Sequence, residues 1–241
     1  MVVIAGILLA WLALAYGWQS FWGGRGVEEL CAKDGGLQIQ RSVVARGILS
    51  DMPWHSDGCL DCVEYLTRFD LDFMDINVRT PSFGRGDVLF PDIGYYRMSI
   101  SIEGDPRCDP WLRAPEAQHM REARSRFGLQ PSQCVVIQKL PKRPSGVVLD
   151  EVNEALPVTG GQQVYLQELR VRVEATGETL GRWRNYTYKS KWQKYLDESG
   201  GGGTVQYSCT QLRPDMAITE FELVGRVLQS GSADPKQNGV H

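Results

Sequence analysis

Histidine is scarce in this chain of 241 residues, which contains only three. The chain also has no G-x-S-x-G elbow, no G-x-x-x-x-G-K-[ST] loop and no G-x-G-x-x-G fingerprint. These three patterns are typical of α/β-hydrolases, P-loop proteins and dinucleotide-binding proteins. With few candidate bases and no placed nucleophile, the sequence predicts no catalytic residue and no cofactor. We therefore expect a protein that is not an enzyme.

Net charge is also small, because 26 Lys and Arg residues oppose 29 Asp and Glu residues, giving −3. Nonspecific coating of nucleic acid depends on neutralising phosphates, so this balance argues against it. The chain is 42% hydrophobic and 23% charged, as expected of a folded chain with a real core. There is no convincing internal repeat, and we expect a single mixed domain.

Charge is absent from the first 24 residues, which contain no Asp, Glu, Lys, Arg or His. Residues 1–22, beginning at Met1, would form a helix of about 33 Å, enough to cross a hydrocarbon core of ~30 Å. Trp18, Phe21 and Trp22 lie at its end, where aromatic rings suit the lipid headgroup zone. We therefore expect residues 1–24 to be a single-pass transmembrane anchor in the lipid bilayer, ended by the glycines at 23, 24 and 26.

Two other interpretations of this segment fit less well. A cleaved signal peptide should open with a basic region, and none precedes the apolar run. A buried core helix rarely stays uncharged over more than about 20 residues. The retained anchor is therefore preferred.

The cysteines indicate the side of the membrane. They are even in number and lie after the anchor, at Cys31, Cys59, Cys62, Cys108, Cys134 and Cys209. This pattern is typical of disulfides in an oxidising compartment. Pairing of Cys31 with Cys209 would tie together the two ends of the domain. Arg25 and Lys33 favour a cytoplasmic domain by the positive-inside rule, but this bias is only two residues, so we expect the domain on the exported side.

The rest of the sequence predicts an α+β, β-dominated soluble domain over residues 25–228, mostly antiparallel with one or two helices, and a disordered tail over 229–241. Its clearest hairpin pairs residues 164–173 with 179–189, and Gly177 can take the positive φ that the turn needs. Alternating apolar and polar residues predict further strands at 37–44, 69–73 and 95–103, and residues 134–140 and 204–210 also have strand character. Helices are expected at 115–127 and 190–196, and residues 216–228 fit either a helix or a strand.

Cys59 and Cys62 form the strongest candidate for chemistry. A CxxC pair is a redox centre when its first cysteine begins a helix in a βαβ unit. A loop rich in Gly and Asp precedes this pair and no crossover pattern surrounds it, so we expect a structural disulfide. A membrane-tethered thiol–disulfide oxidoreductase is the alternative. His55, Cys59 and Cys62 would supply three zinc ligands, but structural zinc takes four, so no metal is predicted.

Aromatic and basic residues interleave late in the chain. We predict an interaction face made of Trp183, Arg184, Tyr186, Tyr188 and Trp192. The pattern resembles a surface for single-stranded nucleic acid, but the acidic chain and the apolar N-terminus favour a protein partner or lipid headgroups. The alternative is an ordinary half-exposed hairpin. The sequence thus favours an exported accessory or binding protein of the cell envelope, acting by protein interaction and without nucleic acid.

Overall fold

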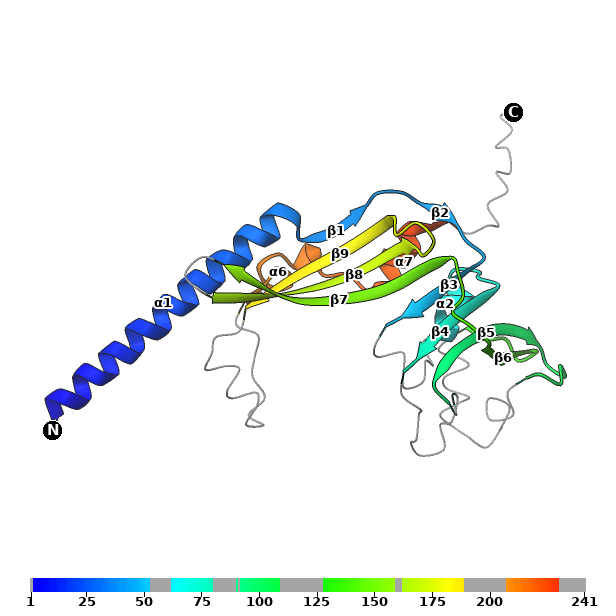
Figure 1. Cartoon of the computed structure of the whole chain (residues 1–241), viewed down its shortest axis with the longest axis horizontal. Helices are drawn as coiled ribbons and strands as arrows, with labels where there is room; N and C mark the ends of the chain where they lie inside the picture. The colour runs from blue at the N-terminus through cyan, green and yellow to red at the C-terminus, as the bar shows by residue number, and fades with distance from the viewer. Residues whose placement is uncertain are drawn as a thin grey trace, which may run out of the picture. The chain divides into compact units, whose positions relative to one another are not determined.

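A computed structural model of the chain describes residues 2–52, 62–79, 90, 92–108, 128–158, 162–188 and 207–229. The helices expected at 115–127 and 190–196 and the tail after residue 229 lie outside these residues. The described chain is β-dominated, with a mixed sheet and few helices (Figure 1). It divides into two compact units, the first formed by Met1–Gln38, Val152–Leu169 and Arg182–Thr219, the second by Ile39–Glu151, Arg170–Gly181 and Glu220–His241.

One sheet has the strand order β1-β9-β8-β7-β3-β4-β5-β6, with β10 paired to β9. Its strands are β1 (Gly36–Ile39), β3 (Gly47–Asp51), β4 (Phe73–Val78), β5 (Gly94–Ile102), β6 (Gln133–Leu140), β7 (Val147–Val158), β8 (Gln162–Val173), β9 (Thr179–Tyr188) and β10 (Tyr207–Ser208).

The sheet departs from the expected antiparallel pairing at β3, which runs parallel to both β4 and β7. The pairs β4–β5 and β5–β6 are antiparallel, so the sheet is mixed. Ile48 and Leu49 of β3 are both buried, which is typical of a strand covered on its two faces. Such a strand lacks the alternation on which the strand predictions relied.

In the first unit, the C-terminal part of α1 (Val2–Asp34) packs on the strands. The core consists of Val27, Cys31, Val164, Leu166, Tyr186, Tyr188 and Cys209. After β10 the chain forms α6 (Cys209–Leu212) and η2 (Pro214–Met216). Residues 204–206 of the strand expected at 204–210 lie outside the described residues. The strand ends at Ser208, because the Ser208 hydroxyl accepts a hydrogen bond from the Gln211 backbone N–H at 3.2 Å and caps a helix instead.

In the second unit, α2 (Cys62–Arg68) packs against β4 and β5. Its Tyr65 ring stacks on Phe221 of α7 (Glu220–Val227), with 4.4 Å between ring centroids. Residues 220–227 are thus helical, and the chain then pairs β11 (Leu228–Gln229) in parallel with β2 (Val43–Val44). Met74 and Met98, on neighbouring strands, are fully buried.

Several predicted elements are confirmed. Residues 95–102 lie in β5, and residues 134–140 in β6. The late hairpin is β8 and β9, and Gly177 in its turn has a φ of 71°. The strand expected over 37–44 is divided into the short strands β1 and β2.

The strand expected at 69–73 is wrong. The backbone N–H groups of Phe69 and Leu71 still donate to the carbonyls of Tyr65 and Leu66, at 3.1 and 3.2 Å. Asp70 has a φ of 51°, a left-handed conformation that Asp tolerates better than most residues. The apolar and acidic alternation here therefore belongs to the end of α2 and the following turn, and β4 begins only at Phe73.

Candidate functional site

The glycines after the apolar segment lie within α1, so the predicted helix break there is wrong, and the helix continues to Asp34. We call Gly23, Gly24 and Gly26 the glycine seam. A Cβ at Gly23 would lie 2.3 Å from Cζ of the buried Tyr188 ring. Each glycine costs a helix about 1 kcal/mol relative to alanine. Here the missing Cβ lets the helix backbone approach the strands closely, which offsets that cost.

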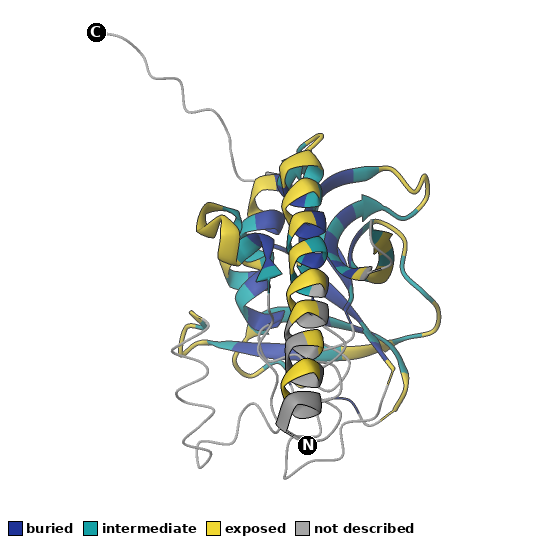
Figure 2. Cartoon of the chain, turned by 90° about the vertical axis from the view of Figure 1, so that its left-hand side faces the viewer, coloured by how far each residue is buried: buried dark blue, intermediate teal, exposed yellow. Residues whose placement is uncertain are grey.

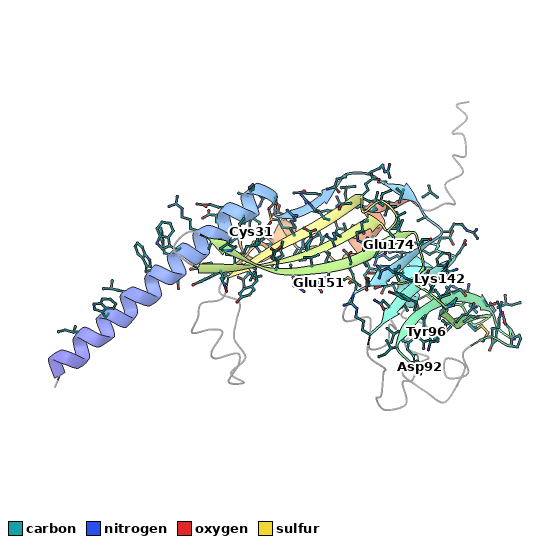
Figure 3. The ribbon with its side chains drawn as sticks, viewed as in Figure 1. Cys31, Asp92, Tyr96, Lys142, Glu151 and Glu174 are labelled. Atoms are coloured by element: carbon teal, nitrogen blue, oxygen red, sulfur yellow. A yellow bond between two sulfur atoms is a disulfide. The ribbon has the colours of Figure 1, made fainter. Side chains whose placement is uncertain are left out.

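A disulfide fixes the same part of α1 to the strands. Cys31 is bonded to Cys209, with 5.5 Å between Cα atoms and a sequence separation of 178. The sequence left the pairing of the six cysteines open, and the structure forms the pair that would tie together the two ends of the domain. Figure 3 shows Cys31 in the part of α1 that lies over the strands. The C-terminal part of α1 is thus held both by close packing and by a covalent bond.

The end of α1 is held by polar contacts as well. The Asp34 carboxylate accepts a hydrogen bond from the Tyr186 hydroxyl at 2.7 Å and is paired with Arg184, which also pairs with Glu168. Burial and the hydrogen bond to Asp34 together raise the pKa of Tyr186 to about 12. These contacts lie within the first unit.

The predicted interaction face is therefore occupied by the chain itself. Trp183, Tyr186 and Tyr188 are buried, with relative exposures of 7%, 2% and 1%, and the Trp183 indole N–H donates to the Met216 carbonyl at 2.8 Å. Arg184 is used in the ion pairs with Asp34 and Glu168. Trp192 lies outside the described residues. The interleaved aromatic pattern arose because α1 and the segment after β10 cover this hairpin.

The N-terminal part of α1 is different, since its described large apolar side chains are exposed (Figure 2). Relative exposures are 59% for Ile7, 72% for Trp11, 73% for Leu14, 61% for Trp18 and 57% for Phe21. In the described part of the chain, no helix meets the length and hydropathy expected of a membrane span.

Cys62 begins α2, which lies in the chain between the parallel strands β3 and β4. The chain therefore has a βαβ crossover here, which the sequence pattern did not predict. Cys62 is disulfide-bonded and fully buried, so its sulfur is held away from solvent and is not a thiolate available to zinc. Cys59 and His55 lie outside the described residues. Among the residues that are described, no cluster of three His, Cys, Asp or Glu side chains could hold a metal ion.

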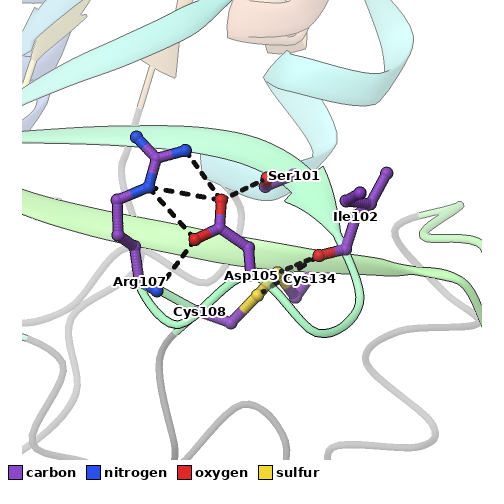
Figure 4. The surroundings of a disulfide bond; sticks show 6 residues. All are labelled: Ser101, Ile102, Asp105, Arg107, Cys108 and Cys134. Carbon is purple, nitrogen blue, oxygen red and sulfur yellow. Dashed lines mark hydrogen bonds and ion pairs between the residues drawn. A yellow bond between two sulfur atoms is a disulfide. The ribbon is translucent and has the colours of Figure 1, made fainter.

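A second disulfide joins Cys108, in the turn segment after β5, to Cys134 at the start of β6 (Figure 4). Beside it, the Asp105 carboxylate accepts hydrogen bonds from the Ser101 hydroxyl at 2.8 Å and from the Arg107 guanidinium at 2.7 Å. The Arg107 and Ser101 hydrogen bonds hold the pKa of Asp105 well below its ordinary value. The turn after β5 is thereby fixed in one conformation.

Polar side chains in the second unit form an ionic network, which we define as Asp51, Asn77, Arg79, Arg143, Asp150, Arg170, Arg172 and Glu174. Asp51 accepts hydrogen bonds from Asn77 at 2.7 Å, from Arg79 at 2.6 Å and from Arg143 at 3.1 Å. Burial alone raises the pKa of Asp51, but these three donors outweigh burial and leave the pKa below its ordinary value.

The network continues through two further carboxylates. Glu174, labelled in Figure 3, pairs with Arg143 at 2.6 Å and with Arg172 at 2.8 Å. Asp150 pairs with Arg170 and Arg172, each at 2.7 Å. Four guanidinium groups thus meet three carboxylates, and each carboxylate is paired with two of these arginines. The arrangement stabilises the strands and has no placed nucleophile or base.

Comparison of the chain with protein-family models, with curated proteins and with solved structures found no match.

Proposed function

We propose that this protein is anchored in a membrane by the N-terminal part of α1 and acts by binding another protein of the cell envelope. The proposal rests on the difference in side-chain exposure between the two parts of α1. Its charge-free part exposes large apolar side chains such as Trp11 and Leu14, whereas the part that follows is packed and disulfide-bonded to the strands. Lipid is the environment in which such exposure costs no free energy.

The disulfides support an exported position for the folded part. Every cysteine that the structure describes is disulfide-bonded, and such bonds persist mainly in oxidising compartments. Rigidly held side chains and the absence of a placed nucleophile among the described residues favour binding over catalysis. Trp18 and Phe21, at the end of the charge-free segment, suit the headgroup zone.

The test is extraction of membranes with alkaline carbonate, comparing the parent chain with Leu14→Lys. A lysine near the middle of a membrane helix costs about 2.5–3.5 kcal/mol, so we expect the parent in the membrane pellet and the variant largely in the supernatant. Ile93→Lys is the matched control, because Ile93 is also exposed, at 61%, but lies in the second unit. A parent chain that is released by carbonate would refute the anchor.

A second candidate function, thiol–disulfide exchange at Cys59 and Cys62, is favoured by one observation. Cys62 begins a helix between two adjacent parallel strands, which is the context of thioredoxin-like redox pairs. Replacing Cys59 by Ser separates the two functions. An oxidoreductase would lose turnover of a model disulfide while staying folded, whereas a structural disulfide would lose thermal stability and have no turnover to lose.

A further inference from the structure

A groove lies beside α1 just after the charge-free segment ends. It has a volume of about 380 Å³ and is lined by Trp22, Arg25, Gly26, Glu29, Leu30, Lys33, Pro157 and Val158. All of these residues belong to the first unit. We call it the α1 groove. Its apolar wall comes from Leu30, Pro157 and Val158, and its polar groups come from one side of α1.

One of these polar groups has no hydrogen-bond partner among the described residues. The Trp22 indole nitrogen is buried and makes no hydrogen bond among the described residues. An indole N–H can only donate, and leaving such a donor buried and unpaired is unfavourable. Tryptophan at a membrane surface usually places this group against a polar acceptor. An acceptor on a bound molecule would remove the cost.

The charges of the groove indicate an anionic acceptor. Arg25 and Lys33 supply two cations against the single carboxylate of Glu29. The Arg25–Glu29 pair, at 3.0 Å, is exposed on both sides and leaves most of the five guanidinium donors available. Lys33 makes no ion pair with any described residue. Arginine, lysine and an N–H donor together are the groups that bind phosphate oxygens.

We propose that the α1 groove binds the phosphate of an anionic phospholipid headgroup in the leaflet that the domain faces. This inference rests on the proposed membrane anchor, because only an anchored helix would bring Trp22 and Arg25 to the headgroup zone. The groove begins at Trp22, within three residues of the first charged residue of the chain, and therefore lies at the level where headgroups would be. Phosphate oxygens would accept hydrogen bonds from Trp22 and Arg25. The positive charge of Lys33, farther along the helix, would add electrostatic attraction.

The full chain, reconstituted in phosphatidylcholine membranes, tests the proposal with spin-labelled phosphatidylglycerol and spin-labelled phosphatidylcholine as probes. We expect the parent chain to restrict the anionic lipid preferentially. Arg25→Gln and Lys33→Gln should each lower that preference by about fivefold, since a cation near an anionic surface contributes on that scale. Trp22→Phe keeps the ring, removes the N–H donor and should lower the restriction of the anionic lipid by about threefold to tenfold.

Arg213→Gln is the matched control. Arg213 belongs to the same unit and is exposed at 55%, but it pairs with Asp215 and does not line the groove. Its loss should leave the lipid preference unchanged. Equal restriction of both lipids by a membrane-bound parent chain, or an equal effect of Arg213→Gln and Arg25→Gln, would overturn the groove proposal alone. A parent chain that fails to associate with the membranes would overturn the anchor as well.

Discussion

Substituting Gly23 by alanine is predicted to destabilise the first unit, although alanine favours helices. A Cβ at this position would lie 2.3–2.4 Å from three atoms of the Tyr188 ring, and Tyr188 is only 1% exposed, so its ring cannot move into solvent. Overpacking of this kind costs about 1–3 kcal/mol, and the gain in helix propensity returns about 1 kcal/mol. The net expectation is a loss of up to about 2 kcal/mol.

Gly17→Ala is the matched control, because nothing lies within 4 Å of a Cβ there, and we expect no loss of stability. The assay is urea unfolding of the full chain in mild detergent with disulfides intact, followed by near-UV circular dichroism. Tyr188→Leu removes the ring atoms that meet the new Cβ, so the double variant should be more stable than the sum of the two losses by over ~0.5 kcal/mol. A Gly23→Ala chain as stable as the parent would refute the close packing of α1 on β9.

Three further predictions concern the bonds described above. Replacing Cys31 and Cys209 together by serine opens a loop of 178 residues and should lower the unfolding free energy by about 2–5 kcal/mol, measured by urea titration against the untouched chain. Tyr186 has a folded-state pKa of about 12, above its ordinary value of 10.0, so its contribution is complete below pH 10 and is lost as pH rises toward 12. Tyr186→Phe should abolish that part of the alkaline destabilisation, and an unchanged slope of stability against pH would contradict this. Asp51 has a pKa below its ordinary value of 3.8, so its contribution is present above that value and is lost as pH falls through the lowered pKa. Asp51→Asn should therefore cost about 1–3 kcal/mol at pH 7 and flatten the acid limb of the stability curve, whereas equal acid sensitivity of variant and parent would contradict the ionic network.

Regular alternation made part of this fold predictable. The strand β5 alternates apolar and polar residues, and β6, β8 and β9 are rich in β-branched and aromatic residues, with Gly177 in the turn between the last two. The central strand β3 lacks this alternation because both its faces are covered, so only the structure shows it. Trp183 and Tyr188, which the sequence suggested as part of an interaction face, are buried because α1 and the segment after β10 cover the hairpin of β8 and β9.

The glycine seam shows how tertiary packing overrides local propensity. Gly23, Gly24 and Gly26 predict a helix end from sequence alone, since glycine is a poor helix former. Gly23 instead allows close packing against Tyr188, which is more than 160 residues away in the chain. A contact between residues so far apart cannot be predicted from a local sequence pattern. The sequence did carry a sign of the ionic network, because Arg170 and Arg172 alternate along β8 and Glu174 follows directly after it.

We propose that the folded part is exported and held at a membrane by α1. Alkylation of cysteines in intact cells with a membrane-impermeant thiol reagent, with and without prior reduction, tests it most directly. If the folded part is exported, all six cysteines react only after reduction and without cell lysis. If the cysteines react only after lysis, and then without any reductant, they are free thiols and the folded part lies in the cytoplasm. That result would contradict the proposal of an exported domain.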